Sequence, residues 1–188
     1  MRDSEAYEMN VIEAIQDRRS IRKFKTDPVP EDDLDMILEA ARLAPSAGNR
    51  QPWRFIVVKN EDTRARLAEL ADHQTFVGIA PVVIAVFGDP DDSPSGYRQD
   101  PMVAYKQDPM IAVEHMCLVA VEMGLGTCWI GPASPRYDVE AIKRLLAVPE
   151  RMYLTCLLPL GYPNQSPKAK SRKSREKIFY FEKYTEDK

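Results

Sequence analysis

The chain has 188 residues, of which 44% are hydrophobic and 29% are charged, and its formal net charge is −3. These values are typical of one soluble domain that buries a core without disulfides, and the negative charge argues against bulk nucleic-acid binding. No apolar run approaches the ~20 residues that span a bilayer, and the N-terminus lacks the apolar segment of a secretory signal. The three cysteines stand far apart among apolar neighbours, so we expect buried, reduced thiols in a cytoplasmic protein.

The hydrophobic pattern predicts alternating strands and helices, with about four strands. The expected elements of the first half are a short helix from Val11, an amphipathic helix between Pro30 and Pro45, a strand at 53–58, a helix at 62–71 and a strand at 81–87 that is buried on both faces. Those of the second half are a loop at 88–101, a buried helix at 108–123, strands at 127–130 and 152–160, and a helix at 141–146. This order predicts one α+β domain over residues 1–188.

Basic side chains are concentrated in the stretch DRRSIRKF, where Arg18, Arg19, Arg22 and Lys23 lie within six positions. By itself the stretch is well explained as a solvated helix end, because cations favour the negative end of the helix dipole. Alternatively, arginine forks and the Ser20 hydroxyl would clamp a phosphate. The stretch alone does not decide between these interpretations.

The loop PSAGNRQPW (45–53) presents Ser46, Asn49 and Gln51 between two prolines. Their mixed donors and acceptors suit the edge of a neutral heterocycle, and the prolines would keep the loop stiff. A plain helix-to-strand turn explains the same residues equally well.

Two closely spaced glycines, Gly124 and Gly126, stand near the start of the stretch MGLGTCWIGPAS (123–134). Gly124 and Gly126 either end a helix or allow the backbone to approach a flat ligand. The spacing is not the GxGxxG fingerprint and does not follow a strand, so a Rossmann dinucleotide site is not supported.

Six basic residues lie between positions 168 and 177, and aromatic residues follow at 179–181. Most such runs are solvated, but this tail could fold back and lend a cation to the anion bound by the first cluster. No metal-ligand spacing, GxSxG, HExxH or P-loop pattern occurs, and no side-chain acid, base or nucleophile stands out. Anion and heterocycle contacts without a catalytic side chain indicate that a cofactor carries the chemistry.

Taken together and in this order, four stretches resemble the nitroreductase family of FMN-dependent oxidoreductases. They are RRSIRKF, APSAGNRQPWRFIVV, MGLGTCWIG, and LGYP with the basic segment after it. The resemblance implies an α+β three-layer sandwich, with helices flanking a mixed, mostly antiparallel sheet, and an intertwined homodimer with FMN at its interface. Residues 165–188 would form a basic and aromatic arm that wraps the partner subunit, because its aromatic residues would otherwise leave an exposed apolar patch.

The resemblance also assigns residues to the cofactor. It implies that the FMN phosphate and ribityl chain are bound by Arg18, Arg19, Ser20, Arg22, Lys170 and Arg172. The flavin would be contacted, often from the other subunit, by Pro45, Ser46, Asn49 and Gln51, and the isoalloxazine ring would lie against Trp129, Ile130 and Gly131. No catalytic side chain and no metal are implied. Gln51 and Arg54 are candidates for stabilising the reduced flavin, although Arg54 is equally well explained as an exposed strand residue.

The implied reaction is ping-pong: NAD(P)H reduces the flavin and leaves, and a nitroaromatic, quinone or similar small acceptor then takes the electrons. One alternative is a specialised flavoenzyme of the same family, such as a reductive dehalogenase or a flavin-fragmenting enzyme. However, residues 88–107 are brief and Asp/Pro-rich, and they show no obvious clamp for a zwitterion. Another alternative is a non-catalytic protein that binds flavin or, through its basic tail, nucleic acid. We expect neither nucleic acid nor a membrane as a partner.

Overall fold

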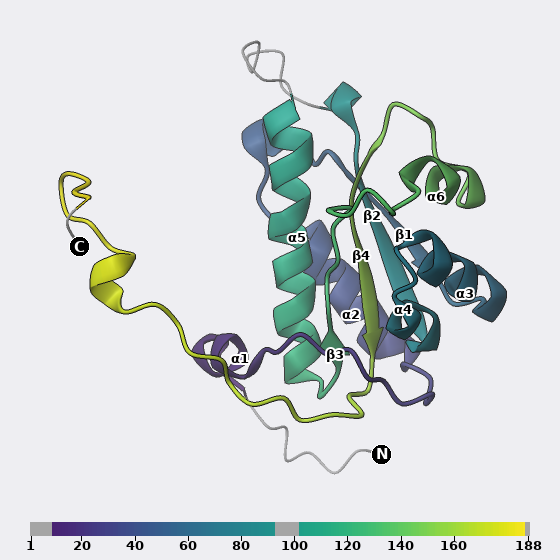
Figure 1. Ribbon diagram of the computed structural model, residues 1–188, viewed down its shortest axis with the longest axis horizontal. Coiled ribbons are helices and arrows are strands. Elements are labelled where there is room, and N and C mark those ends of the chain that lie inside the picture. The colour runs from purple at the N-terminus through teal and green to yellow at the C-terminus, as the bar shows by residue number, and fades with distance from the viewer. Residues whose placement is uncertain (1–8, 93–101, 187–188) are drawn as a thin grey trace.

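The computed structural model describes residues 9–92 and 102–186, and the strands in this part of the chain form one sheet in the order β1-β2-β4-β3 (Figure 1). The helices are α1 (Val11–Asp17), α2 (Glu31–Arg42), α3 (Glu61–Leu70), α4 (Thr75–Ile79), α5 (Met102–Glu122) and α6 (Val139–Leu145). The strands are β1 (Trp53–Val58), β2 (Val82–Gly88), β3 (Gly126–Thr127) and β4 (Tyr153–Gly161). All pairings between these strands are antiparallel, and one isolated parallel bridge joins Ser20 to Thr127.

Helices cover both faces of the sheet, which explains why β2 is apolar at successive positions. Ile84 and Val86 belong to the core shared with α2 and α5, whereas Ala85 and Phe87 belong to the core shared with α3, α4 and α6. The side chains alternate in this way because successive residues of a strand point to opposite faces. The predicted α+β three-layer sandwich is confirmed (Figure 1).

The helix α2 illustrates how well the local signals predict an element. It begins directly after Pro30, and its first turn holds Glu31, Asp32 and Asp33, which interact favourably with the helix dipole. Its apolar face buries Ile37 and Ala41, both with 0% exposure, against α5. The predicted buried helix in the second half is α5 itself, which packs against both α2 and the sheet.

The start of α5 was placed too late by the sequence pattern. The apolar pattern placed the start at Asp108, but the helix begins at Met102 and contains Pro109 in its interior. A proline there has no N–H to donate to the carbonyl oxygen of Tyr105, four residues earlier. Gly88 lies against that oxygen so closely that a Cβ would come within 1.7 Å of it. Glycine at position 88 therefore makes room for this part of the helix.

Three further details differ from the predicted elements. The helix α4 was not predicted, because five residues are too few to show a periodic pattern. The strand predicted at 127–130 is shorter, since regular pairing ends at Thr127 and only an isolated bridge follows between Ile130 and Leu157. Within the predicted loop at 88–101, Pro90–Asp92 form a 3-10 turn, and residues 93–101 lie outside the described part of the chain.

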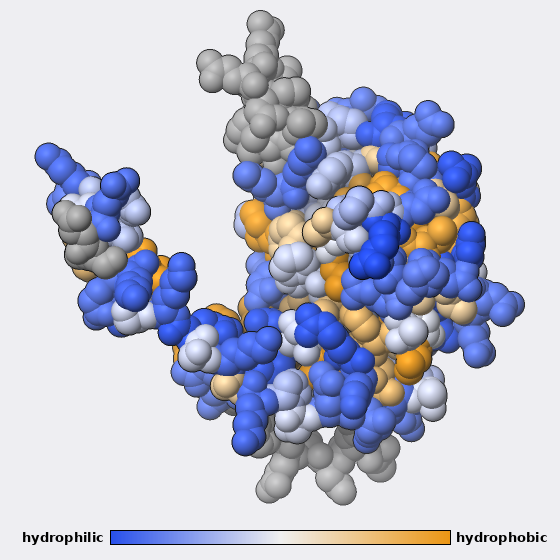
Figure 2. All heavy atoms as spheres, in the orientation of Figure 1, coloured by the Kyte–Doolittle hydropathy of each residue, from blue (hydrophilic) through white to orange (hydrophobic). Residues whose placement is uncertain are grey.

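The C-terminal segment leaves the domain and extends away from it (Figure 1). Its surface is mostly hydrophilic, with smaller hydrophobic areas among the charged residues (Figure 2). Among the residues described, no helix has the length and apolar character needed to span a bilayer.

Candidate functional site

The basic residues near the two ends of the chain line one hollow of about 260 Å³. Its lining is formed by Arg18, Arg19, Ser20, Arg22, Gln165, Pro167, Lys168, Lys170 and Arg172. Six of these nine residues are cationic and none is acidic, so the hollow is suited to an anion. The structure thus brings together all six residues that the sequence resemblance assigned to the phosphate. It adds Lys168 and Gln165, which sequence reasoning did not select, although Lys168 belongs to the basic run already noted.

Backbone pairing explains why the tail reaches the N-terminal stretch. The amide of Lys25 donates to the carbonyl of Tyr162 at 2.9 Å, and the amide of Asn164 donates to the carbonyl of Lys23 at 2.8 Å. The side chain of Gln165 reaches the carbonyl of Ser20 at 3.5 Å. The residues after β4 therefore run beside the basic stretch, and the lysines that follow Pro167 meet its arginines.

Gly124, which precedes β3, and Gly126, the first residue of β3, have different roles. Gly124 has a φ of +71° just after α5, which is typical of a glycine that ends a helix. At Gly126, a Cβ would lie 2.5 Å from the side chain of Ile21. The amide of Ile21 donates to the carbonyl of Thr127 at 2.9 Å. Close approach at Gly126 thus serves the packing of the basic stretch against β3.

The three arginines that the N-terminal stretch contributes to the hollow are engaged differently. Arg18 pairs with Glu114 of α5, with Nε 3.6 Å from the carboxylate oxygen. Arg19 donates to the carbonyls of Gln16 and Arg18 at the end of α1, as expected for a helix-end cation. Arg22 is exposed and forms no ion pair or hydrogen bond within residues 9–92 and 102–186. Its planar fork is therefore the most available for a bidentate contact with phosphate.

The three cysteines are buried and free, as predicted. Burial raises the pKa of Cys117 to about 12, and burial also raises the pKa of Cys128 although Arg22 and Ser20 act in the opposite direction. These thiols therefore stay protonated near neutral pH and are not activated nucleophiles. The described residues contain no group of three or more His, Cys, Asp or Glu that could hold a metal ion.

The loop that contains Pro45, Ser46, Asn49 and Gln51 is not part of the lining of the cationic hollow. The Ser46 hydroxyl accepts a hydrogen bond from the amide of Gln51 at 2.9 Å. The Gln51 side chain donates to the carbonyl of Asn49 at 3.1 Å. Ser46 thus holds the shape of the loop, whereas the side chains of Asn49 and Gln51 remain exposed.

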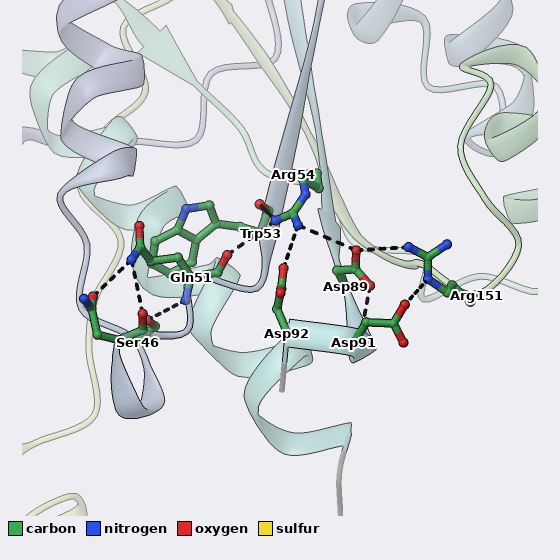
Figure 3. A network of polar contacts seen from close by, with 9 residues as sticks. Ser46, Gln51, Trp53, Arg54, Asp89, Asp91, Asp92 and Arg151 are labelled. Atoms are coloured by element: carbon green, nitrogen blue, oxygen red, sulfur yellow. Dashed lines mark hydrogen bonds and ion pairs between the residues drawn. The ribbon is translucent and has the colours of Figure 1, made fainter. Parts of the chain in front are cut away.

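Trp129, Ile130 and Gly131 also lie outside the lining of the hollow. Trp129 has 48% exposure, while Ile130 is buried and exchanges backbone hydrogen bonds of 2.9 and 3.0 Å with Leu157. Arg54, a candidate for stabilising reduced flavin, forms ion pairs with aspartates that follow β2 (Figure 3). One subunit therefore brings together the residues predicted to bind the phosphate but not all of the predicted flavin contacts.

The fold and the hollow together define an α+β sandwich suited to an anionic ligand. A family model described as "Nitroreductase family" matches residues 15–74 and 71–162, so the chain belongs to this family. The predicted family is thereby confirmed.

Relatives and solved structures agree with this placement. A Methanothermobacter thermautotrophicus protein with the provisional name NADH dehydrogenase/NAD(P)H nitroreductase is 37% identical over 167 residues, which are 88% of this chain and 83% of the relative. The iodotyrosine deiodinase of Thermotoga neapolitana is 29% identical over 178 residues, covering 81% of this chain and 88% of the relative. The structure of an FMN-dependent nitroreductase from Clostridium difficile has a TM-score of 0.80 and 30% identity, covering 92% and 99% of the two chains.

Proposed function

We propose that the protein is an FMN-dependent oxidoreductase that takes electrons from NAD(P)H and passes them to nitroaromatics, quinones or similar small acceptors. The observation that carries the proposal is the hollow with six cationic and no acidic lining residues. Family membership supports the enzyme class. The names of the relatives support both the use of NAD(P)H and FMN as the cofactor.

The residues present fit the phosphate end of FMN. Arg22 has no competing partner among the described residues, and Lys168 and Lys170 face the same hollow from the tail. A phosphate monoester carries close to two negative charges, which this surplus of cations would neutralise. When bound, FMN supplies the hydride and electron transfer that no side chain of the protein can perform. The protein's own residues would bind and orient it.

A homodimer would complete the site. The apolar face of α1 is exposed, with 69% exposure at Val11 and 52% at Ile15, and Leu43 after α2 is 64% exposed. Next to this face is an apolar hollow of about 380 Å³, which is lined by residues of α1, α2 and α5. Exposed patches of this kind mark interaction surfaces. A second subunit on this surface would also supply the predicted loop contacts that a single subunit does not bring to the cationic hollow.

The C-terminal arm supports the same arrangement. Phe181 and Tyr184 are 84% and 71% exposed on a segment that extends away from its own domain (Figure 2). We infer that the arm wraps the partner subunit. The free, buried thiols support a reducing compartment, and we propose the cytoplasm.

The proposal is tested by the absorption spectrum of the purified protein with added FMN, followed by anaerobic reduction with NADH and with NADPH. We expect a bound-flavin spectrum, bleaching by a nicotinamide, and recovery of the colour on addition of a quinone or nitroaromatic. Absence of any FMN affinity would rule the proposal out.

A specialised reductive dehalogenase is a second candidate, because one of the relatives is named an iodotyrosine deiodinase. Slow reaction with all generic acceptors, together with rapid dehalogenation of a halogenated tyrosine, would favour this alternative.

A further inference from the structure

The loop between α2 and β1 has a strained backbone. Gly48, Asn49 and Gln51 have φ angles of 58°, 54° and 52°. Asn49 and Gln51 carry side chains, and the left-handed region is unfavourable for L-residues that have a Cβ. Such backbone persists only where surrounding contacts determine it, and it is frequent at ligand-binding segments. The contacts that hold this loop therefore decide whether Asn49 and Gln51 are presented in one conformation.

Two of these contacts involve residues in the first part of the loop, Ser46 and Ala47. The Ser46 hydroxyl accepts the Gln51 amide at 2.9 Å, which closes the loop on itself. The carboxylate of Asp108, a buried residue of α5, accepts the amide of Ala47 at 2.9 Å and joins the loop to the core. Neither contact involves the carbonyl groups of Gln51, Pro52 or Trp53, where the loop enters β1.

Arg54 holds this second end of the loop. Its Nη1 donates to the carbonyl of Trp53 at 2.8 Å and lies 3.5 Å from the carbonyl oxygen of Gln51 (Figure 3). Its Nη2 lies 2.6 Å from a carboxylate oxygen of Asp92 and 3.7 Å from one of Asp89. One guanidinium thus connects two loop-end carbonyls to two carboxylates, which the planar fork of arginine allows.

Asp89 anchors the guanidinium group of Arg54. Its side chain is only 6% exposed, and a buried carboxylate needs a cation close to it. Its amide also donates to the carbonyl of Pro52 at 2.6 Å, directly beside Gln51. Arg151 approaches the same carboxylate at 3.4 Å, but its other contact is with Asp91 at 2.6 Å. Arg151 therefore shares Asp89 with Arg54 without contacting the loop (Figure 3).

We propose that Arg54 is a positioning residue that, anchored by Asp89, keeps the loop in the conformation that presents Asn49 and Gln51 to the flavin. The identity of the ligand rests on the proposed function. The contacts by which Arg54 fixes the loop do not depend on it. Arg54 acts through the backbone of the loop, and its charge is already balanced by carboxylates. This role differs from direct stabilisation of a reduced flavin.

The test compares Arg54→Met with Arg151→Met, because both remove one cation from Asp89 and only Arg54 touches the loop. Hydrogen exchange of the peptide 45–52, followed by mass spectrometry in the protein without FMN, reports the loop. An FMN titration reports binding. We expect Arg54→Met to reduce loop protection and to raise the FMN Kd about fivefold, which corresponds to a competent fraction about one fifth of the native one, since apparent Kd varies inversely with that fraction. Arg151→Met should change neither quantity by more than about twofold on the same argument.

Arg54→Lys is the second variant, because it keeps a cation beside Asp89 and protects the fold. A single ammonium group cannot reach both carbonyls and both carboxylates as a fork does, so we expect loop protection to remain reduced. Equal effects of Arg54→Met and Arg151→Met would overturn the proposal. Weaker FMN binding with unchanged loop exchange would also overturn it, because Arg54 would then contact the ligand directly. If neither the native protein nor any variant binds FMN, but hydrogen exchange of the loop changes as expected, the proposed function is wrong. The role of Arg54 in fixing the loop is then still supported.

Discussion

The arginines of the cationic hollow show how neighbouring residues of one type acquire different roles. Arg19 is bound to helix-end carbonyls and Arg18 is paired with Glu114, whereas Arg22 has no partner among the described residues. Both initial interpretations of the stretch DRRSIRKF therefore apply, to different residues. Arg19 behaves as a helix-end cation, and Arg22 is the best candidate for the anion.

We predict that Arg22→Ala weakens FMN binding by about 10- to 100-fold, because a hydrogen bond to a charged group is worth about 1.5–3 kcal/mol. Lys23→Ala is the matched control, since its side chain is not part of the lining and its backbone pairing with Asn164 is unaffected. Titrations of each variant with FMN, followed by flavin fluorescence, provide the measurement. Equal affinities in both variants would show that the stretch is only a helix end.

For individual residues, the sequence indicated the candidates for binding the anion but not which of their side chains are free to bind it. Six of them meet in one hollow, as the resemblance implied. Which arginine is free depends on Glu114, which is almost a hundred positions away and comes close only through the packing of α1 on α5. The strained loop was likewise recognised as a turn, but its anchors Asp89 and Asp108 are distant in sequence and carry no local signal of this role.

The elements were predicted best where one local signal defines them. The strand β1 agrees with the prediction at both ends, and α2 follows its proline and acidic first turn. The predicted start of α5 was wrong because the apolar pattern is clear only from Asp108 onward, and the close approach of Gly88 to Tyr105 in the first part of the helix is a tertiary feature. β3 was predicted too long because its end depends on pairing with β4, which its own sequence does not encode.

The short strand β3 controls the position of the basic stretch, and this leads to a prediction. Gly126→Ala places a methyl group 2.5 Å from Ile21 and should destabilise the protein by about 1–3 kcal/mol, as overpacked sites do. Because the basic stretch must shift, FMN affinity should fall as well. Urea unfolding and FMN titration give the two values.

Gly124→Ala is the control for this prediction, because a methyl group there meets no atom within 4 Å and only the positive φ is unfavourable. It should lower stability without changing FMN affinity. Unchanged affinity in Gly126→Ala would contradict a role of β3 in placing the arginines.

At the scale of the whole molecule, the parts of the predicted cofactor site are separated within one subunit. The cationic hollow includes neither the loop around Asn49 nor Trp129. The same molecule exposes the apolar face of α1 and the aromatic residues of its arm. The separated site and the exposed apolar residues are both explained if two copies of the chain associate through these surfaces. The buried apolar area would stabilise the dimer, and the interface would join the parts of the site.

We therefore predict that Ile15→Asp converts a dimer into a monomer and abolishes tight FMN binding in the same step. A charge on the apolar face of α1 would be buried without a partner in the dimer, which is strongly unfavourable. Ile79→Asp is the matched control, because Ile79 is 50% exposed and Ile15 is 52% exposed, but Ile79 lies on α4 at the opposite face of the sheet. Sedimentation velocity gives the oligomeric state and an FMN titration gives the affinity of each variant. A monomeric native protein that binds FMN tightly would contradict the shared site, since one subunit would then suffice for the cofactor.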